Sequence, residues 1–123
     1  MASTAVETPP RTTAAELDCV AEFTGGSELL FGGQKRLALK LPARISNDGK
    51  ADPNGRPFTV RDLLVHLRRQ HLKDRPELFV QGEDIRPGIL IVINEVDSEL
   101  CGHLDYELQT GDSVLFISTL HGG

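Results

Sequence analysis

The residues with the clearest chemical potential lie at the end of the chain, where residues 118–123 read Ser-Thr-Leu-His-Gly-Gly. Glycine lacks a Cβ, so Gly122 and Gly123 adopt any backbone angle and fit a narrow channel. About five extended residues reach roughly 16 Å past a domain, which would carry the Gly123 carboxylate into the nucleotide site of another enzyme. A carboxylate is a poor electrophile without a good leaving group, so adenylation by ATP is the expected first step. The alternative interpretation is that the chain ends in two glycines by chance and that they have no function.

The other chemically capable side chains do not predict an internal active site. The four histidines (His66, His71, His103 and His121) show no zinc-ligand spacing with Cys19 and Cys101. No Ser-His-Asp, Walker or dinucleotide-binding pattern is found, and two cysteines are too few for a four-cysteine iron–sulfur cluster. Both cysteines are interpreted as small reduced core residues, with a reactive thiol as the alternative. The sequence predicts neither catalytic residues nor a metal site.

The formal charge of −5 is unevenly distributed along the chain. Residues 1–76 carry twelve basic and nine acidic side chains, whereas residues 77–123 carry only Arg86 against nine acidic ones. The acidic half disfavours direct nucleic-acid binding and favours a partner with a basic docking surface, although ordinary solubility explains it equally well. No apolar run approaches the roughly 20 residues that span a bilayer, and no signal peptide is recognisable. We therefore expect a cytosolic protein.

The reactive end needs a folded domain to carry it, and 123 residues predict one domain. Residues 1–16 are predicted to be a disordered tail, 17–118 the domain, and 119–123 a flexible tail. Within the domain, residues 46–57 consist of turn formers and are interpreted as a mobile loop. Strands are predicted at 17–23 and 35–41, joined into a hairpin through glycine turns and an apolar plug at 29–31.

One main helix is predicted to begin directly after residue 58. Thr59 is a good N-cap, and Asp62 at the third helical position resembles the acidic partner of a capping box. Pro76 marks the latest position at which this helix can end. The apolar residues at helical spacing, which predict its buried face, are Val60, Leu63, Leu64 and Leu67.

The C-terminal half is predicted to add two more strands to the sheet. Residues 89–93 are apolar at every position, as in a strand covered on both faces, and residues 78–80 form a short extended piece. An acidic connector of short turns at 95–112 leads to the last strand, 114–119. One helix across a mixed sheet of four or five strands is an α+β roll.

The last strand predicts a candidate docking surface beside the tail. If a helix covers one face of the sheet only, the bulkier pair Val114 and Phe116 should point toward it. Leu115 and Ile117 then face outward, and an exposed apolar pair beside a reactive end suggests a partner surface. Coverage of this pair by another connector is the alternative.

A distinctive set of residues links these elements to a known family. In the C-terminal half, the set comprises residues 85–89 (Ile-Arg-Pro-Gly-Ile), 93–94, 97, 99–100, 102, 105–106, 108, 111–112 and 118–123. In the first hairpin, it comprises residues 20–23, 25–26 and 30–32. In this set the chain closely resembles the ubiquitin-related modifier family of sulfur-carrier ubiquitin-like proteins. The resemblance covers residues 18–123 apart from 46–57. The N-terminal tail, the long loop and Ser98, at a position where an aromatic is often seen, depart from it.

The resemblance implies a β-grasp fold and a substrate of enzymes rather than an enzyme. An E1-like enzyme with a rhodanese domain would adenylate Gly123 with ATP and convert it to a thiocarboxylate, a 1-thioglycine. The sulfur would pass to a tRNA thiolase complex for 2-thiolation of the wobble uridine in cytosolic tRNAs. Gly123 would also form isopeptide bonds with lysines of target proteins under oxidative stress, with peroxiredoxins among the candidates. The tail held by the activating enzyme would be Thr119, Leu120, His121 and Gly122.

Two classes of function stay open. The first is the modifier and sulfur carrier, and the second is a non-covalent β-grasp binding module whose Gly-Gly end is incidental. Within the first class, carriers for molybdopterin or thiamine synthesis share the Gly-Gly end, whereas the preceding Ser-Thr-Leu-His favours the tRNA pathway. We expect a cytosolic monomer, with the nucleus as a second location, that binds no cofactor, nucleic acid or membrane directly.

Overall fold

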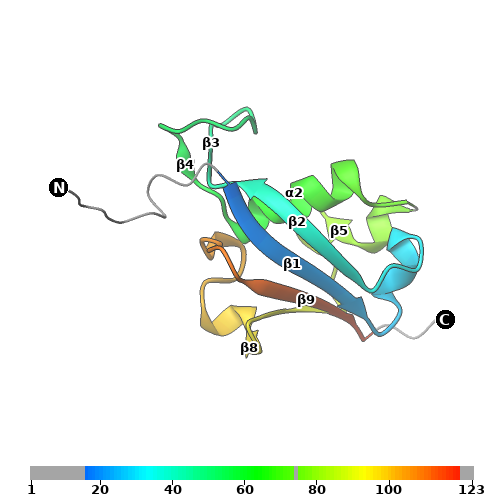
Figure 1. The fold of residues 1–123 in the computed structure, drawn as a ribbon. Coiled ribbons are helices and arrows are strands. Elements are labelled where there is room, and N and C mark those ends of the chain that lie inside the picture. Colours follow the sequence, from blue (N-terminus) through cyan, green and yellow to red (C-terminus); the bar gives the residue numbers. More distant parts are fainter. Residues whose placement is uncertain (1–15, 74, 120–123) are drawn as a thin grey trace.

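The computed structural model describes residues 16–73 and 75–119, whose main feature is a five-stranded mixed sheet with a helix across one face (Figure 1). The five strands lie in the order β2-β1-β9-β7-β8. This arrangement confirms the predicted β-grasp fold. The elements are β1 (Glu16–Thr24), β2 (Arg36–Pro42), α2 (Val60–Gln70), β7 (Ile89–Ile93), β8 (Val96–Asp97) and β9 (Ser113–Ser118).

The last strand lies at the centre of the sheet, between the first strand and β7. β9 pairs in parallel with β1 and antiparallel with β7, so that Phe116 lies opposite Phe23 on one side and Ile91 on the other. A parallel pair cannot be closed by a tight turn, and here residues 25–112 form the connection between its two strands. The tail is therefore attached to the best-supported strand of the domain.

The helix is formed by the local signals that predicted it. The backbone nitrogen of Thr59 donates to Asp62 Oδ2 at 2.9 Å, and the capping box is complete. The helix ends at Gln70, well before Pro76. The predicted apolar face is buried in full: Val60, Leu63, Leu64 and Leu67.

Aromatic side chains from β1, a 3₁₀ turn, β9 and the residue before the short strand β5 (Val80–Gln81) meet in the core between helix and sheet. The rings of Phe23 and Phe31 stack with centroids 4.1 Å apart, and Phe23 lies 5.5 Å from Phe116. Phe79 closes the group, with its centroid 5.1 Å from Phe31 and 5.3 Å from Phe116. Offset and edge-on aromatic pairs add to burial, so this cluster fixes β9 against the rest of the domain.

Three local predictions need correction. Of the apolar plug only Phe31 is buried; the plug is a 3₁₀ turn, η2 (Ser27–Phe31), that leaves Leu29 71% exposed. Of the predicted extended piece 78–80, Leu78 ends a 3₁₀ turn, η3 (Pro76–Leu78), and only Val80 is in a strand, β5 (Val80–Gln81), which pairs with β6 (Asp84–Ile85). Strand 89–93 is not covered on both faces, because Leu90 is 51% exposed on the face that the helix does not cover.

The segment predicted as a mobile loop carries more backbone pairing than its composition indicates. Its last two residues form β4 (Arg56–Pro57), which pairs with β3 (Arg44–Ile45). Within it, the backbone nitrogen of Ser46 donates to Lys50 O at 2.9 Å. Its mobility stays a prediction.

The acidic connector consists, as predicted, of short elements: β8, η4 (Ser98–Leu100) and η5 (His103–Asp105). No helix among the described residues is long and apolar enough to cross a membrane.

Candidate functional site

The start of β9 is fixed by one buried carboxylate. Asp112 accepts hydrogen bonds from Asn94 Nδ2, the hydroxyl of Tyr106 and the backbone nitrogen of Gln109, each at 2.8 Å. Burial, together with the hydrogen bond to Asp112, raises the pKa of Tyr106 to about 12, so this hydroxyl stays a donor at physiological pH. The network joins the β7–β8 turn to the connector directly before the last strand.

The end of β9 is fixed by Thr119, the last residue that the structure describes. Its backbone nitrogen and its Oγ1 both donate to the carbonyl oxygen of Gly88, each at 2.6 Å. The β7–β9 register pairs Ile89 with Ser118, so this contact continues the ladder by one residue. The tail therefore begins from a defined point beside the start of β7.

The first turn of the chain also closes around the end of β9. A Cβ built on Gly25 would collide with the carbonyl oxygen of Ser118, and Gly25 has a φ of 72°. Only glycine combines this close approach with a left-handed backbone. The buried hydroxyl of Ser27 lies 3.0 Å from the carbonyl oxygens of both Thr24 and Phe116, to either of which it donates.

One cation lies near this end of the sheet, in the acidic half of the chain. Arg86 Nη1 donates to the carbonyl oxygen of Glu77 at 3.1 Å, and its backbone nitrogen donates to Phe79 O at 2.8 Å. Arg86 Nε is buried without a hydrogen-bond partner among the described residues. Arg86 is close in sequence to Gly88, so the backbone that receives Thr119 is attached to this anchored arginine.

The outward face of the last strand carries the predicted apolar pair. Val114 and Phe116 are fully buried toward the helix, and Leu115 and Ile117 are half-buried on the other face, so the predicted alternation is confirmed. The pair is less exposed than the docking hypothesis assumed, because neighbouring strands flank it. Leu115 lies between Glu22 and Val92, and Ile117 lies between Thr24 and Leu90.

The apolar surface is therefore larger than the sequence predicted. Leu90, 51% exposed, and half-buried Val92 extend it across β7. We call Leu90, Val92, Leu115 and Ile117 the sheet-face patch. Sequence reasoning missed its β7 members because an all-apolar strand was taken as covered on both sides.

The remaining predicted tail residues lie outside the described part of the chain. These are Leu120, His121, Gly122 and Gly123. Thr119 is the only predicted tail residue whose contacts the structure describes, and they place it at the base of the tail.

The two cysteines do not contribute a reactive group to this end. Burial, then the charge of Asp112, raises the pKa of Cys19 to about 11, so its thiol stays protonated and a poor nucleophile. Cys101 is free and half-buried against the core, with its Sγ 3.8 Å from the carbonyl oxygen of Asp97. Both positions agree with the interpretation of core residues.

One arrangement went unnoticed in the sequence. Ser98 Oγ lies 2.7 Å from His103 Nδ1, and His103 Nε2 lies 3.0 Å from Asp84 Oδ1. The residue types are those of a hydrolase triad, but Ser98 is only 1% exposed, so no substrate reaches its hydroxyl. These two hydrogen bonds instead attach the β5–β6 hairpin to the acidic connector. Among the described residues, no group of three His, Cys, Asp or Glu is placed to hold a metal ion.

Comparison with known proteins identifies the family. The model of the family Urm1 (Ubiquitin related modifier) matches residues 18–123. Ubiquitin-related modifier 1 of Homo sapiens is 51% identical over 110 residues, covering 89% of this chain and 99% of that protein. The Drosophila ananassae homologue is 50% identical over 109 residues, covering 89% and 97%. The solution structure of Urm1 from Trypanosoma brucei superposes with a TM-score of 0.66 at 37% identity, covering 90% of this chain and 100% of that one. The chain therefore belongs to the Urm1 family of ubiquitin-like modifiers.

Proposed function

We propose that this chain is a sulfur carrier and protein modifier that acts through the carboxylate of Gly123. An E1-like enzyme with a rhodanese domain adenylates Gly123 with ATP. The terminal sulfur of a persulfide on that enzyme then displaces AMP to give an acyl disulfide. Attack by a second thiol of the enzyme on this S–S bond releases the thiocarboxylate and leaves an enzyme disulfide. The observation that carries this proposal is the family match, which spans residues 18–123 and so includes the Gly-Gly end.

The geometry of the last strand supports a reaction at the tail rather than inside the domain. Phe116 is fully buried in the central strand, and Thr119 is held by two hydrogen bonds to Gly88. A rigid base limits the positions that the following residues reach, which lowers the entropy cost of entering a partner's active site. The sheet-face patch lies on the same strand and is the surface proposed to dock on the activating enzyme.

The sulfur is proposed to reach a tRNA thiolase complex, which uses it to 2-thiolate the wobble uridine of cytosolic tRNAs. A thiocarboxylate sulfur is anionic near neutral pH and, like a thiolate, a strong nucleophile. The protein would work in the cytosol and also in the nucleus, and ATP is consumed by the enzyme rather than bound here. A carrier for molybdopterin synthesis is the competing assignment within this class.

Attachment to lysines is proposed to follow from the same activated group. A lysine amine of a target attacks the acyl carbon of the thiocarboxylate, forming an isopeptide bond and releasing hydrogen sulfide, and a target thiol would form a thioester with the same leaving group. Target proteins would include peroxiredoxins under oxidative stress. Conjugation would then require the thiocarboxylate and not only the adenylate.

Intact-mass spectrometry tests the carrier function directly. The full chain is incubated with its activating enzyme, ATP and a sulfur donor, and its mass should rise by the difference between a sulfur and an oxygen atom. Omission of ATP, or deletion of Gly123, should abolish the shift. An unmodified chain under complete conditions would favour the non-covalent binding module.

A second experiment separates sulfur transfer from conjugation. Replacing the sulfur-donating cysteine of the activating enzyme should stop both thiolation and lysine attachment while adenylation continues. Lysine conjugates that still form at the normal rate would show an ordinary ubiquitin-type modifier, in which conjugation does not depend on sulfur transfer.

A further inference from the structure

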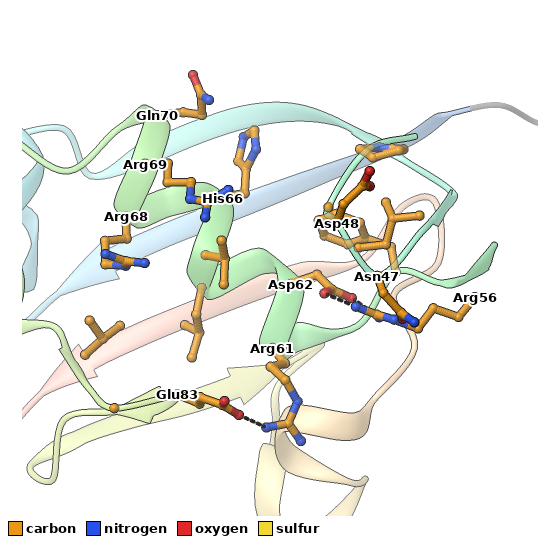
Figure 2. Close-up of a pocket in the computed structure, with 18 residues that line it drawn as sticks. Asn47, Asp48, Arg56, Arg61, Asp62, His66, Arg68, Arg69, Gln70 and Glu83 are labelled. Carbon is orange, nitrogen blue, oxygen red and sulfur yellow. Dashed lines mark hydrogen bonds and ion pairs between the residues drawn. The ribbon is translucent and has the colours of Figure 1, made fainter. Parts of the chain in front are cut away.

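A second surface lies on the helix side of the molecule, away from the sheet-face patch. A groove of about 450 Å³ runs along the exposed side of α2. It is bordered by residues 47–49 of the long loop and by Val80, Gly82 and Glu83 of the β5–β6 hairpin (Figure 2). Because α2 covers one face of the sheet and the patch lies on the other, both surfaces are open to partners at once.

The ends of this groove differ in how their charges are balanced. Arg56 binds both carboxylate oxygens of Asp62, at 2.7 and 2.9 Å. Arg61 is paired with Glu83 at 3.6 Å and with Asp105 at 2.8 Å. These two guanidinium groups are neutralised by the protein itself (Figure 2).

Arg68 and Arg69 have no such partners. Both side chains are exposed, and neither forms an ion pair or hydrogen bond with a side chain in the described part of the protein. They extend from the helix at the end of the groove away from Asp48 (Figure 2). Two unpaired guanidinium groups on successive helical residues suit an acidic segment, because each group can bind a carboxylate in a bidentate fashion.

An apolar position completes the same stretch of helix. Val65 is 38% exposed and precedes Arg68 and Arg69 by three and four residues, so the three side chains lie on one face of the helix. Half-buried Val80 also lines the groove. His66 adds a neutral ring at physiological pH, because burial and then the neighbouring His71 lower its pKa.

We infer that this groove docks an acidic segment of a partner protein, with carboxylates on Arg68 and Arg69 and an apolar side chain on Val65. The volume lies within the range of roughly 300–1,000 Å³ typical of binding pockets. A continuous phosphate backbone such as that of RNA fits less well, since, of the described arginines that line the groove, only Arg68 and Arg69 are unpaired, and Asp48, at the other end of the groove, would repel phosphates that extend along it. The site is separate from Gly123 and does not depend on the proposed sulfur chemistry.

Fluorescence anisotropy with a defined acidic probe tests this inference on the full chain. The probe is a fluorescein-labelled peptide, Glu-Asp-Leu-Glu-Glu-Leu-Asp-Glu. The control peptide has serine in place of both leucines. We expect saturable binding that weakens as salt is added, because the contacts are exposed charges. The serine peptide should bind more weakly, since it lacks the apolar contact to Val65.

Matched charge reversals localise the binding. The double variant Arg68→Glu and Arg69→Glu should lower the affinity for the peptide by about tenfold or more. The control variant, Lys35→Glu with Arg36→Glu, changes the net charge equally at two exposed residues that do not line the groove, and should bind as the parent does. Amide NMR shifts of the parent should concentrate at residues 65–70. Circular dichroism checks that each variant is folded.

Four results would overturn the inference. One is equal loss of binding in both double variants, which means attraction by net charge alone. Another is parent-like affinity in the Arg68 and Arg69 variant. A third is tighter binding of a uridine oligonucleotide of matched charge, which assigns the groove to RNA. The last is self-association of the parent protein, measured by sedimentation, that is abolished by reversing the charges of Arg68 and Arg69. That result would mean that a second copy of this chain occupies the groove.

Discussion

Thr119 donates two hydrogen bonds to one acceptor, the carbonyl oxygen of Gly88, from its backbone nitrogen and from Oγ1. The backbone bond extends the β7–β9 ladder, and the hydroxyl bond adds a contact that only serine or threonine could make at this position. Together they set the point from which residues 120–123 start.

Thr119→Val should remove the hydroxyl bond and keep the shape of the side chain. Because the bond is exposed, we expect the free energy of unfolding to fall by about 0.5–1 kcal/mol, measured by urea denaturation. Thr119→Ser keeps the donor and is the matched control. Equal stability of the valine and serine variants would show that the hydroxyl does not contribute to the anchor.

Gly25→Ala should destabilise the domain strongly. The added methyl group collides with the carbonyl oxygen of Ser118, and alanine is strained at a φ of 72°. We expect a loss of about 3 kcal/mol in the free energy of unfolding from the two effects together. Gly33→Ala is the control, since its φ of 85° is equally unfavourable but its surroundings are open, and it should lose about 1 kcal/mol. Similar losses in both would contradict the close approach.

Leu90→Asp should weaken binding to the activating enzyme without unfolding the domain. Leu90 is the most exposed member of the sheet-face patch, so a carboxylate there remains solvated in the free protein and is buried on docking. Leu100→Asp is the control, because Leu100 is 80% exposed and lies in η4, outside the patch. Calorimetric titration measures both affinities. Leu115→Asp should have the same effect, but loss of its fold would show that half-buried Leu115 belongs to the core.

Deletion of Gly123, or of both terminal glycines, should abolish adenylation and leave thermal stability unchanged. The described core includes no residue beyond Phe116, so the deletion removes the reactive group alone. ATP–pyrophosphate exchange with the activating enzyme measures the reaction. Full exchange by the truncated chain would disprove the proposal that Gly123 is the reactive end.

The Asp62 capping box should make stability depend on pH. Burial opposes the charge of Asp62, but hydrogen bonds from Arg56 and Thr59 outweigh it and hold its pKa below the usual 3.8. The ionised form is therefore favoured by folding, and its contribution is present above pH 3.8 and lost as the pH falls through the lowered pKa. Asp62→Asn should lose about 1–3 kcal/mol at pH 7 and progressively less below pH 3.8, in urea titrations. A constant difference down to pH 2 would contradict this assignment.

Short-range rules predicted the parts of the fold that short-range forces determine. The Thr59 cap, the buried helix face and the inward direction of Val114 and Phe116 all follow from spacing within one element. The exposure of Leu90 could not be predicted, because an all-apolar strand looks the same whether one or two of its faces are covered.

Contacts between segments that are far apart in the sequence also could not be predicted from it. Asp84 and His103 are nineteen positions apart, and Gly25 meets Ser118 across almost the whole chain. The β3–β4 hairpin was missed for another reason: turn formers dominate its composition, while the pairing of Arg44 with Pro57 depends on how the turns close. The groove beside Arg68 and Arg69 exists only once the loop and the β5–β6 hairpin flank the helix.

The central position of β9 has a consequence for biosynthesis. Its pairing with β1 joins the first described strand to the last described one, which the ribosome synthesises long after β1. Such a contact closes a very long loop and forms late in folding. A nascent or prematurely terminated chain that lacks residues 113–118 would expose Phe23, Ile91 and the rest of the unfilled sheet centre, and would be a substrate for chaperones and proteases. The domain can thus complete its sheet only once the strand that leads into the reactive end has been made, so copies without that strand would be removed rather than compete for the activating enzyme.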